Sequence, residues 1–127
     1  MIKIEALDHL VLTVADIERS CAFYTSILGM EVITFADNRK ALKFGDQKIN
    51  LHQQGAEFEP KAAHPLPGSA DLCFIISSNM SELQQHLNEQ GIKIEQGPVQ
   101  RNGARGKIES IYIRDPDQNL IEIACYL

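Results

Sequence analysis

The sequence predicts an α+β fold in which two βαβββ modules pair as an open, cup-shaped barrel. The prediction rests on an internal repeat: the strand-like stretch around His9 returns at Asp71, 62 positions later, and the helix-ending glycines Gly29 and Gly91 are separated by the same 62 positions. One helix can cover only one face of a small sheet. The uncovered faces of two such sheets can therefore pack together and enclose a pocket.

Length and composition are those of one globular domain over residues 1–127. Of the 127 residues, 44% are hydrophobic and 23% are charged, which are ordinary values. The net charge of −5 argues against nucleic acid or an anionic membrane as a partner. No apolar run approaches the roughly 18 residues needed to span a bilayer, and the N-terminus has no apolar signal core, so we expect a cytoplasmic protein. The three separated cysteines fit neither a disulfide framework nor a Cys-x-x-Cys metal site.

The first module is predicted over residues 6–53. Asp16 is a suitable N-cap for a helix over 17–28, and Gly29 is a suitable helix stop. Strands are predicted at 6–14, 31–35, 40–44 and 48–52. A connector with several prolines and glycines, 54–69, follows without periodicity.

The second module, 70–127, repeats this order. A helix is predicted over 79–90, and the glycine- and arginine-containing stretch 97–106 reads as a loop. Strands are predicted at 71–76, 92–95, 109–113 and 119–126.

Strand alternation predicts which polar side chains face the pocket. The most aliphatic positions of each strand should lie under the helix, so the alternate positions face the other way. These pocket-facing residues are His9, Asn50, His52, Asp71, Cys73 and Glu122. Imidazole and carboxylate groups together suit a divalent cation such as Zn²⁺, Ni²⁺, Fe²⁺, Co²⁺ or Mn²⁺, with a coordination position left open for substrate.

Each of these candidate residues can also have an ordinary structural role. His9 can be a satisfied polar residue at a strand start, and Asp71 can cap a turn. His52 can be a metal ligand or the outer partner of one. Glu122 interrupts an aliphatic strand, so it needs a partner if it is buried.

Further residues could contact a substrate. Ser110 and Tyr112 share one strand face and serve either substrate contact or ordinary packing. Arg101 and Arg105 lie in the glycine-containing stretch, where they could bind an anionic group or remain solvated.

Three motifs resemble the glyoxalase/vicinal-oxygen-chelate superfamily over essentially the whole chain. They are the segments 8–14, 23–30 and 110–117, the last followed by Leu120-Ile121-Glu122. The segments 39–52 and 58–68 also resemble the subfamily called glyoxalase-domain-containing protein five. The resemblance implies paired βαβββ modules, a divalent metal ion with Ni²⁺ or Zn²⁺ preferred, a small-molecule substrate and a homodimer.

Residue by residue, the resemblance carries the family's metal positions onto His9, Asn50, Asp71 and Glu122. The chain has Asn50 where glyoxalase I has glutamate and Asp71 where most members have histidine. The implied function is a metal-dependent lyase of the lactoylglutathione lyase type, which isomerises the hemithioacetal of methylglyoxal and a thiol, with glutathione as a possible co-substrate.

In this reading each candidate residue receives a role. The catalytic residues are Glu122 and His52, the metal ligands are His9, Asp71, Glu122 and His52, and the substrate contacts are Asn50, Ser110, Tyr112 and Arg105. Two alternatives stay open: a thiol transferase of the fosfomycin-resistance type, which the Ser110-x-Tyr112 pattern resembles, and a non-catalytic small-molecule binding protein. The pocket can form within one chain or across a dimer.

Overall fold

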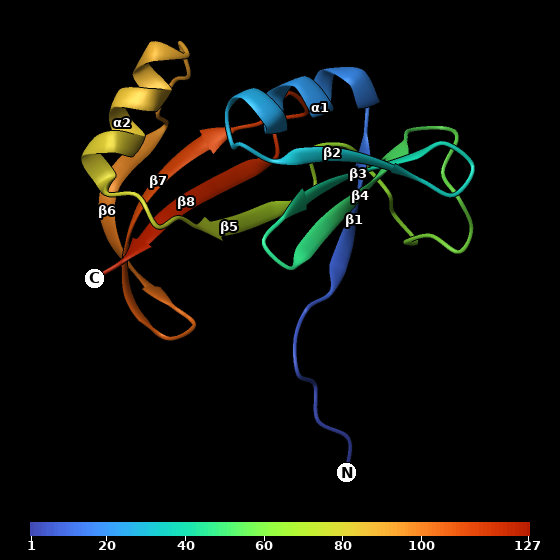
Figure 1. The fold of residues 1–127 in the computed structure, drawn as a ribbon, viewed down its shortest axis with the longest axis horizontal. Helices are drawn as coiled ribbons and strands as arrows, with labels where there is room; N and C mark the ends of the chain where they lie inside the picture. The colour runs from blue at the N-terminus through green and yellow to red at the C-terminus, as the bar shows by residue number, and fades with distance from the viewer. The chain divides into compact units, whose positions relative to one another are not determined.

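The computed structural model describes residues 1–127 as two compact units, Met1–Pro67 and Gly68–Leu127 (Figure 1). Each unit contains four strands and one helix in the order β-α-β-β-β. No helix of this chain has the length and apolarity required to span a membrane.

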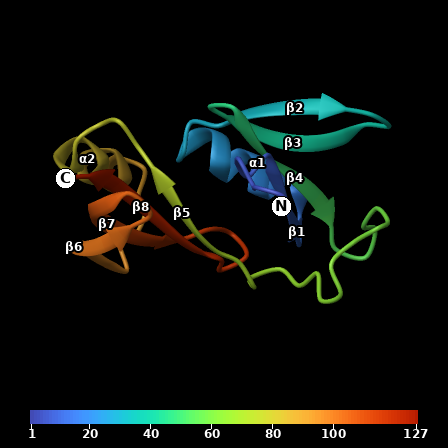
Figure 2. The same cartoon turned by 90° about the horizontal axis from the view of Figure 1, so that it is seen from below.

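The first unit is built on a mixed sheet. Its elements are β1 (His9–Val14), α1 (Ile17–Ser26), β2 (Glu31–Phe35), β3 (Arg39–Phe44) and β4 (Gln47–Gln53). The strands lie in the order β1-β4-β3-β2, with β1 parallel to β4 and the other neighbours antiparallel. Helix α1 covers one face of this sheet (Figure 2).

Local chemistry explains where α1 begins and how it packs. The Asp16 carboxylate accepts a hydrogen bond from the Arg19 backbone N–H, as expected of an N-cap. Past the helix end, Gly29 has a φ of 66°, a conformation that glycine adopts without a steric penalty. Tyr24 of α1 is fully buried, as are Leu42 of β3 and Ile49 of β4.

The second unit repeats the same topology. Its elements are β5 (Asp71–Ile75), α2 (Met80–Glu89), β6 (Gln96–Gly103), β7 (Gly106–Arg114) and β8 (Leu120–Tyr126). The strand order β5-β8-β7-β6 matches that of the first unit position for position. The predicted fold class of paired βαβββ modules is therefore confirmed.

One predicted element is wrong. The segment 92–95 is not a strand, and β6 instead occupies Gln96–Gly103, most of which was expected to be a loop. The pairing of β6 with β7 shifts between Gln96 and Val99, so a bulge takes up the Gly97-Pro98 pair. Because β6 lies at the edge of its sheet, a proline there removes no essential ladder hydrogen bond.

A buried turn fixes the start of β8 against the start of β5. Asp115 is 2% exposed, and its carboxylate accepts hydrogen bonds from the Asp117 and Asn119 backbone N–H groups and from Asn119 Nδ2. Asn119 Oδ1 accepts from the backbone N–H of Ala70. These bonds set the positions of the strands that carry Asp71 and Glu122.

Candidate functional site

The face of the second sheet opposite α2 carries a single acidic residue at its centre. Glu122 on β8 is paired in register with Cys73 on β5 and with Tyr112 on β7. Residues paired across neighbouring strands point to the same side of a sheet, so these three side chains share one face.

Two neighbours hold the Glu122 carboxylate in place. The Ser110 hydroxyl, which is fully buried, donates a hydrogen bond to Oε2 at 2.5 Å. The Cys73 thiol also hydrogen-bonds the carboxylate. Burial, reinforced by the Glu122 charge, raises the pKa of Cys73 to about 11. Cys73 therefore stays protonated near neutral pH and acts as a donor to Glu122 rather than as a nucleophile.

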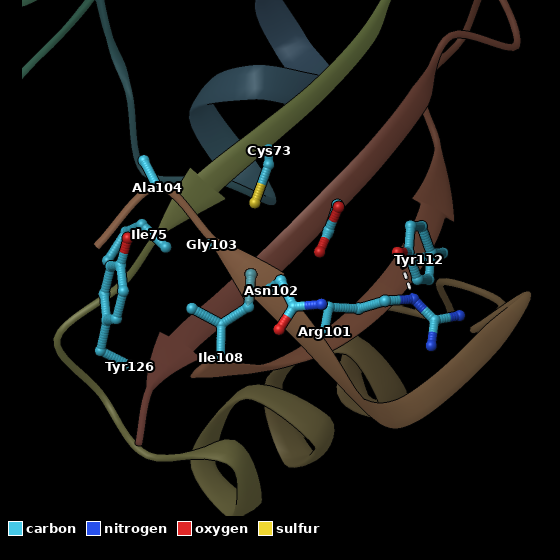
Figure 3. Close-up of a pocket in the computed structure, with 10 residues that line it drawn as sticks. Cys73, Ile75, Arg101, Asn102, Gly103, Ala104, Ile108, Tyr112 and Tyr126 are labelled. Atoms are coloured by element: carbon cyan, nitrogen blue, oxygen red, sulfur yellow. Dashed lines mark hydrogen bonds between the residues drawn. The ribbon is translucent and has the colours of Figure 1, made fainter. Parts of the chain in front are cut away.

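A pocket of about 550 Å³ opens over this carboxylate (Figure 3). Arg101 and Tyr112 meet at one end of it, where Arg101 Nε donates to the Tyr112 hydroxyl at 3.0 Å. Ile75 and Tyr126 lie at the other end, and Ile108 adds to the apolar wall. The pocket thus offers a cation, a carboxylate and an apolar surface to one small ligand.

Asp71 lies on the same face as Glu122 but nearer the strand end. It begins β5, two residues before Cys73, and is paired with Leu120. Its side chain is exposed and does not line the pocket. The second unit thus presents two carboxylates on one sheet face, one held by hydrogen bonds and one open to solvent.

In the first unit, His9 begins β1 and contacts its neighbour Asp8. Its side chain is 43% exposed, and Nδ1 lies 2.8 Å from an Asp8 carboxylate oxygen. If Nδ1 donates this hydrogen bond, Nε2 is the ring nitrogen that faces a ligand. Imidazole ligands of metal ions are commonly oriented in this way.

His52 lies apart from His9. In the β1–β4 ladder, His9 is paired with Lys48 and His52 with Thr13, a separation of about 13 Å along the strand. The side chain of His52 is buried, and Nε2 lies 3.3 Å from Arg39 Nη2. Burial first, and the Arg39 charge second, lower the pKa of His52. The imidazole is therefore neutral at pH 7, and its accepting nitrogen is already engaged by Arg39.

Asn50 occupies the position in the first sheet that Glu122 occupies in the second. Asn50 is paired with Val11 on β1, as Glu122 is with Cys73 on β5. Asn50 is 6% exposed, and its Oδ1 has no hydrogen-bond partner in the protein. Buried acceptors are nearly always satisfied, so this oxygen is available to a donor from a ligand or a water.

The structure brings some predicted residues together and separates others. Glu122 and Tyr112 line the pocket, and the buried Ser110 is bonded to Glu122. The Arg105 guanidinium instead lies 4.3 Å from the Tyr126 ring, and Arg105 lines a different hollow of about 790 Å³. Neither unit by itself brings three His, Cys, Asp or Glu side chains into a group that could hold a metal ion.

Two residues that hydrogen-bond to the predicted pair Glu122 and Tyr112 are not among the predicted site residues: Cys73 contacts Glu122, and Arg101 contacts Tyr112. Strand alternation in the sequence already places Cys73 beside Asp71 on the pocket-facing side, and the structure adds its contact with Glu122. The sequence leaves Arg101 open as an anion-binding or a solvated residue of a loop, whereas the structure places it on β6. As part of β6, Arg101 projects onto the same sheet face as Glu122.

Comparison with known proteins gives consistent matches. The family model of the Glyoxalase/Bleomycin resistance protein/Dioxygenase superfamily matches residues 6–123. Virulence protein STM3117 of Salmonella typhimurium is 59% identical over 98% of this chain and 86% of its own length. Its crystal structure covers 99% of this chain and 100% of that chain with a TM-score of 0.98.

Two further matches carry names from the same group. Glyoxalase domain-containing protein RDO1 of Mycosarcoma maydis is 56% identical over 98% of this chain and 70% of its own length. A lactoylglutathione lyase from Agrobacterium tumefaciens is 24% identical and has a TM-score of 0.74, covering 97% of this chain and 95% of that chain. At this level of identity the likeness is one of fold.

Proposed function

Because the chain belongs to the Glyoxalase/Bleomycin resistance protein/Dioxygenase superfamily, we propose that it is a metal-dependent lyase of the lactoylglutathione lyase type. It would isomerise the hemithioacetal of methylglyoxal and a thiol to a thioester. The observation that carries the proposal is Glu122, an acid held by Ser110 at a pocket large enough for a small ligand. The Agrobacterium tumefaciens lyase shows that the fold is compatible with such a reaction in another protein.

The donor groups fit a divalent cation, with Ni²⁺ or Zn²⁺ preferred. His9, Asp71 and Glu122 would hold it, and the Asp8 contact that frees His9 Nε2 supports this assignment. The proposal requires His9 to join the two carboxylates at one ion, within one chain or between two copies. When bound, the ion supplies positive charge that stabilises the negative charge developing on two neighbouring substrate oxygens.

Proton transfer is assigned to Glu122. The isomerisation removes a proton from the carbon that bears sulfur and adds a proton to the neighbouring carbon. The base must therefore first accept a proton and then donate it. Glu122 faces the pocket, and the Ser110 and Cys73 contacts restrict its rotation. The lone pair of His52 is engaged by Arg39, so we favour Glu122 as the base, and a catalytic or ligand role for His52 stays a prediction.

The test is a metal-dependent assay. Ni²⁺ or Zn²⁺ is added to metal-free protein, and thioester formation is measured with methylglyoxal and glutathione as substrates. We expect metal-stimulated turnover that falls at least about 100-fold in Glu122→Gln, since both a ligand and the base are lost. A wild-type protein that binds the metal by elemental analysis yet forms no thioester above the uncatalysed rate would end the proposal.

We further propose that the enzyme acts as a cytoplasmic homodimer. Sedimentation equilibrium on purified protein would measure the mass, and cell fractionation would measure the location. A protein that is monomeric at all concentrations would contradict the homodimer, and the site could then form only within one chain.

A further inference from the structure

We propose that Arg101 is the specificity-determining residue of the pocket in the second unit and that the substrate carries a carboxylate. The inference rests on the proposed function and narrows it to substrates that carry an acid group.

The Arg101 guanidinium is oriented by neutral groups. Nε donates to the Tyr112 hydroxyl at 3.0 Å, and Nη1 donates to the Gln100 carbonyl at 3.1 Å. The guanidinium carbon lies 5.6 Å from the Tyr112 ring centroid. Two hydrogen bonds and a ring contact hold the group in one orientation, so little side-chain freedom is left to lose on binding an anion.

Arg101 has no acidic partner, unlike another arginine on the same sheet face. Arg114 forms a two-pronged contact with Glu95, with both N···O distances at 2.9 Å. Arg101 forms no ion pair, and its Nη2 makes no hydrogen bond within the protein. A half-buried cation that is held in place but not neutralised leaves its charge to a ligand.

The rest of the pocket wall favours a carboxylate as that ligand group. Ile75 and Ile108 form an apolar part of the wall and offer no competing donor. A guanidinium edge presents parallel N–H groups that match the two oxygens of a carboxylate. In a partly desolvated pocket such a contact is stronger than at an open surface.

The positions of Arg101 and Glu122 set the size of the substrate. Tyr112 is the β7 neighbour of Glu122, and Arg101 is bonded to the far end of the Tyr112 side chain. The cation thus lies about one tyrosine length from the acid. A substrate of a few carbon atoms can place its reacting oxygens near Glu122 and its carboxylate on Arg101, and the 550 Å³ pocket can contain it.

The first experiment compares two thiols that differ only in charge. 3-Mercaptopropionate and 3-mercaptopropionamide each form a hemithioacetal with methylglyoxal. We expect the wild type to favour the acid in kcat/KM by about 10- to 100-fold, as a charge-assisted contact provides. Arg101→Gln should bring this ratio close to one. Lys93→Gln removes an exposed positive charge of the same unit away from the pocket and should keep the wild-type ratio. An acid preference that survives in Arg101→Gln overturns the inference.

The second experiment does not depend on turnover. Metal-free wild-type protein is titrated with 3-(methylthio)propanoate or with its amide, and the Arg101 Nε–Hε resonance is followed by NMR. This resonance is identified by its absence from the Arg101→Gln spectrum. The acid should shift it and the amide should not. If no thiol gives turnover but the acid moves the resonance, the proposed lyase function fails and the inference stands. A resonance that the acid leaves in place overturns the inference.

Discussion

Ser110 shows how one buried hydroxyl can fix the group on which the proposed chemistry depends. Its side chain is fully buried, and the Glu122 carboxylate is its acceptor. The hydrogen bond limits the orientations available to Glu122. A ligand that is already oriented loses less freedom when it binds a metal ion.

We predict that Ser110→Ala lowers metal affinity by about 10- to 100-fold, because Glu122 loses an orienting donor. Isothermal titration with Zn²⁺ or Ni²⁺ measures the change. Ser20→Ala is the matched control: its Oγ is also buried but has no partner, and it lies in the helix of the first unit. Unchanged affinity in a folded Ser110→Ala protein would show that Ser110 has no positioning role.

His52 should make stability depend on pH. Burial and Arg39 lower its folded-state pKa below the usual 6.5, so the unfolded chain takes up the proton first as pH falls. The stabilising contribution is therefore complete above about pH 6.5 and decreases as pH falls from there toward the folded-state pKa. Urea denaturation at pH 7.5 and pH 5.5 should show a smaller stability loss in His52→Gln than in the wild type. Equal losses in the two proteins would contradict this.

At the scale of elements, β6 decides the shape of the pocket. Its bulge places Gly97 against β7, and the ladder then resumes from Val99 to Gly103. Gly97 has a φ of 108°, and a Cβ there would lie 2.4 Å from the Ser110 carbonyl oxygen. The bulge thus needs glycine for its backbone conformation and for the close approach to β7.

Gly97→Ala should destabilise the protein by about 2 to 4 kcal/mol, since β7 must move to admit the methyl group and the backbone becomes strained. Gly91→Ala is the control, because its φ of 68° is also positive but nothing lies within 4 Å of the added carbon. It should cost about 1 to 2 kcal/mol. Urea denaturation measures both values. A Gly97→Ala protein as stable as Gly91→Ala would mean that β7 adjusts without cost.

At the scale of the molecule, the proposed metal ligands are divided between the two units. His9 belongs to the first unit, and Asp71 and Glu122 belong to the second. The division makes a mixing experiment decisive, because two inactive variants can complement each other only if one site uses both chains.

We predict that His9→Ala and Glu122→Gln are each inactive, since each lacks a proposed ligand. After the two are mixed, unfolded and refolded together, a site shared between chains would regain activity, because a mixed dimer contains one site with both residues intact. A site within one chain would regain none. Thioester formation measures the recovery. Substantial activity in either single variant would contradict the proposed ligand set.

Much of the fold could be predicted from the sequence because the signals are local. Alternating residues, a capping Asp16 and the glycine stops identify elements one at a time, and their repetition identifies the module. The strand β6 escaped prediction because Gly97 and Pro98 resemble a loop when read alone. Only pairing with β7 shows that they form a bulge within a strand.

By itself, the sequence determined the two βαβββ modules and the alternation that places Glu122 opposite the helix-facing side of its strand. Tertiary structure alone decided which groups touch: Ser110 with Glu122, and Arg101 with Tyr112. The physical reason is that alternation is a property of one strand, whereas these contacts depend on the register between strands. The bulge in β6 changes that register, and it is defined by pairing between residues of β6 and β7 rather than by neighbours in the sequence.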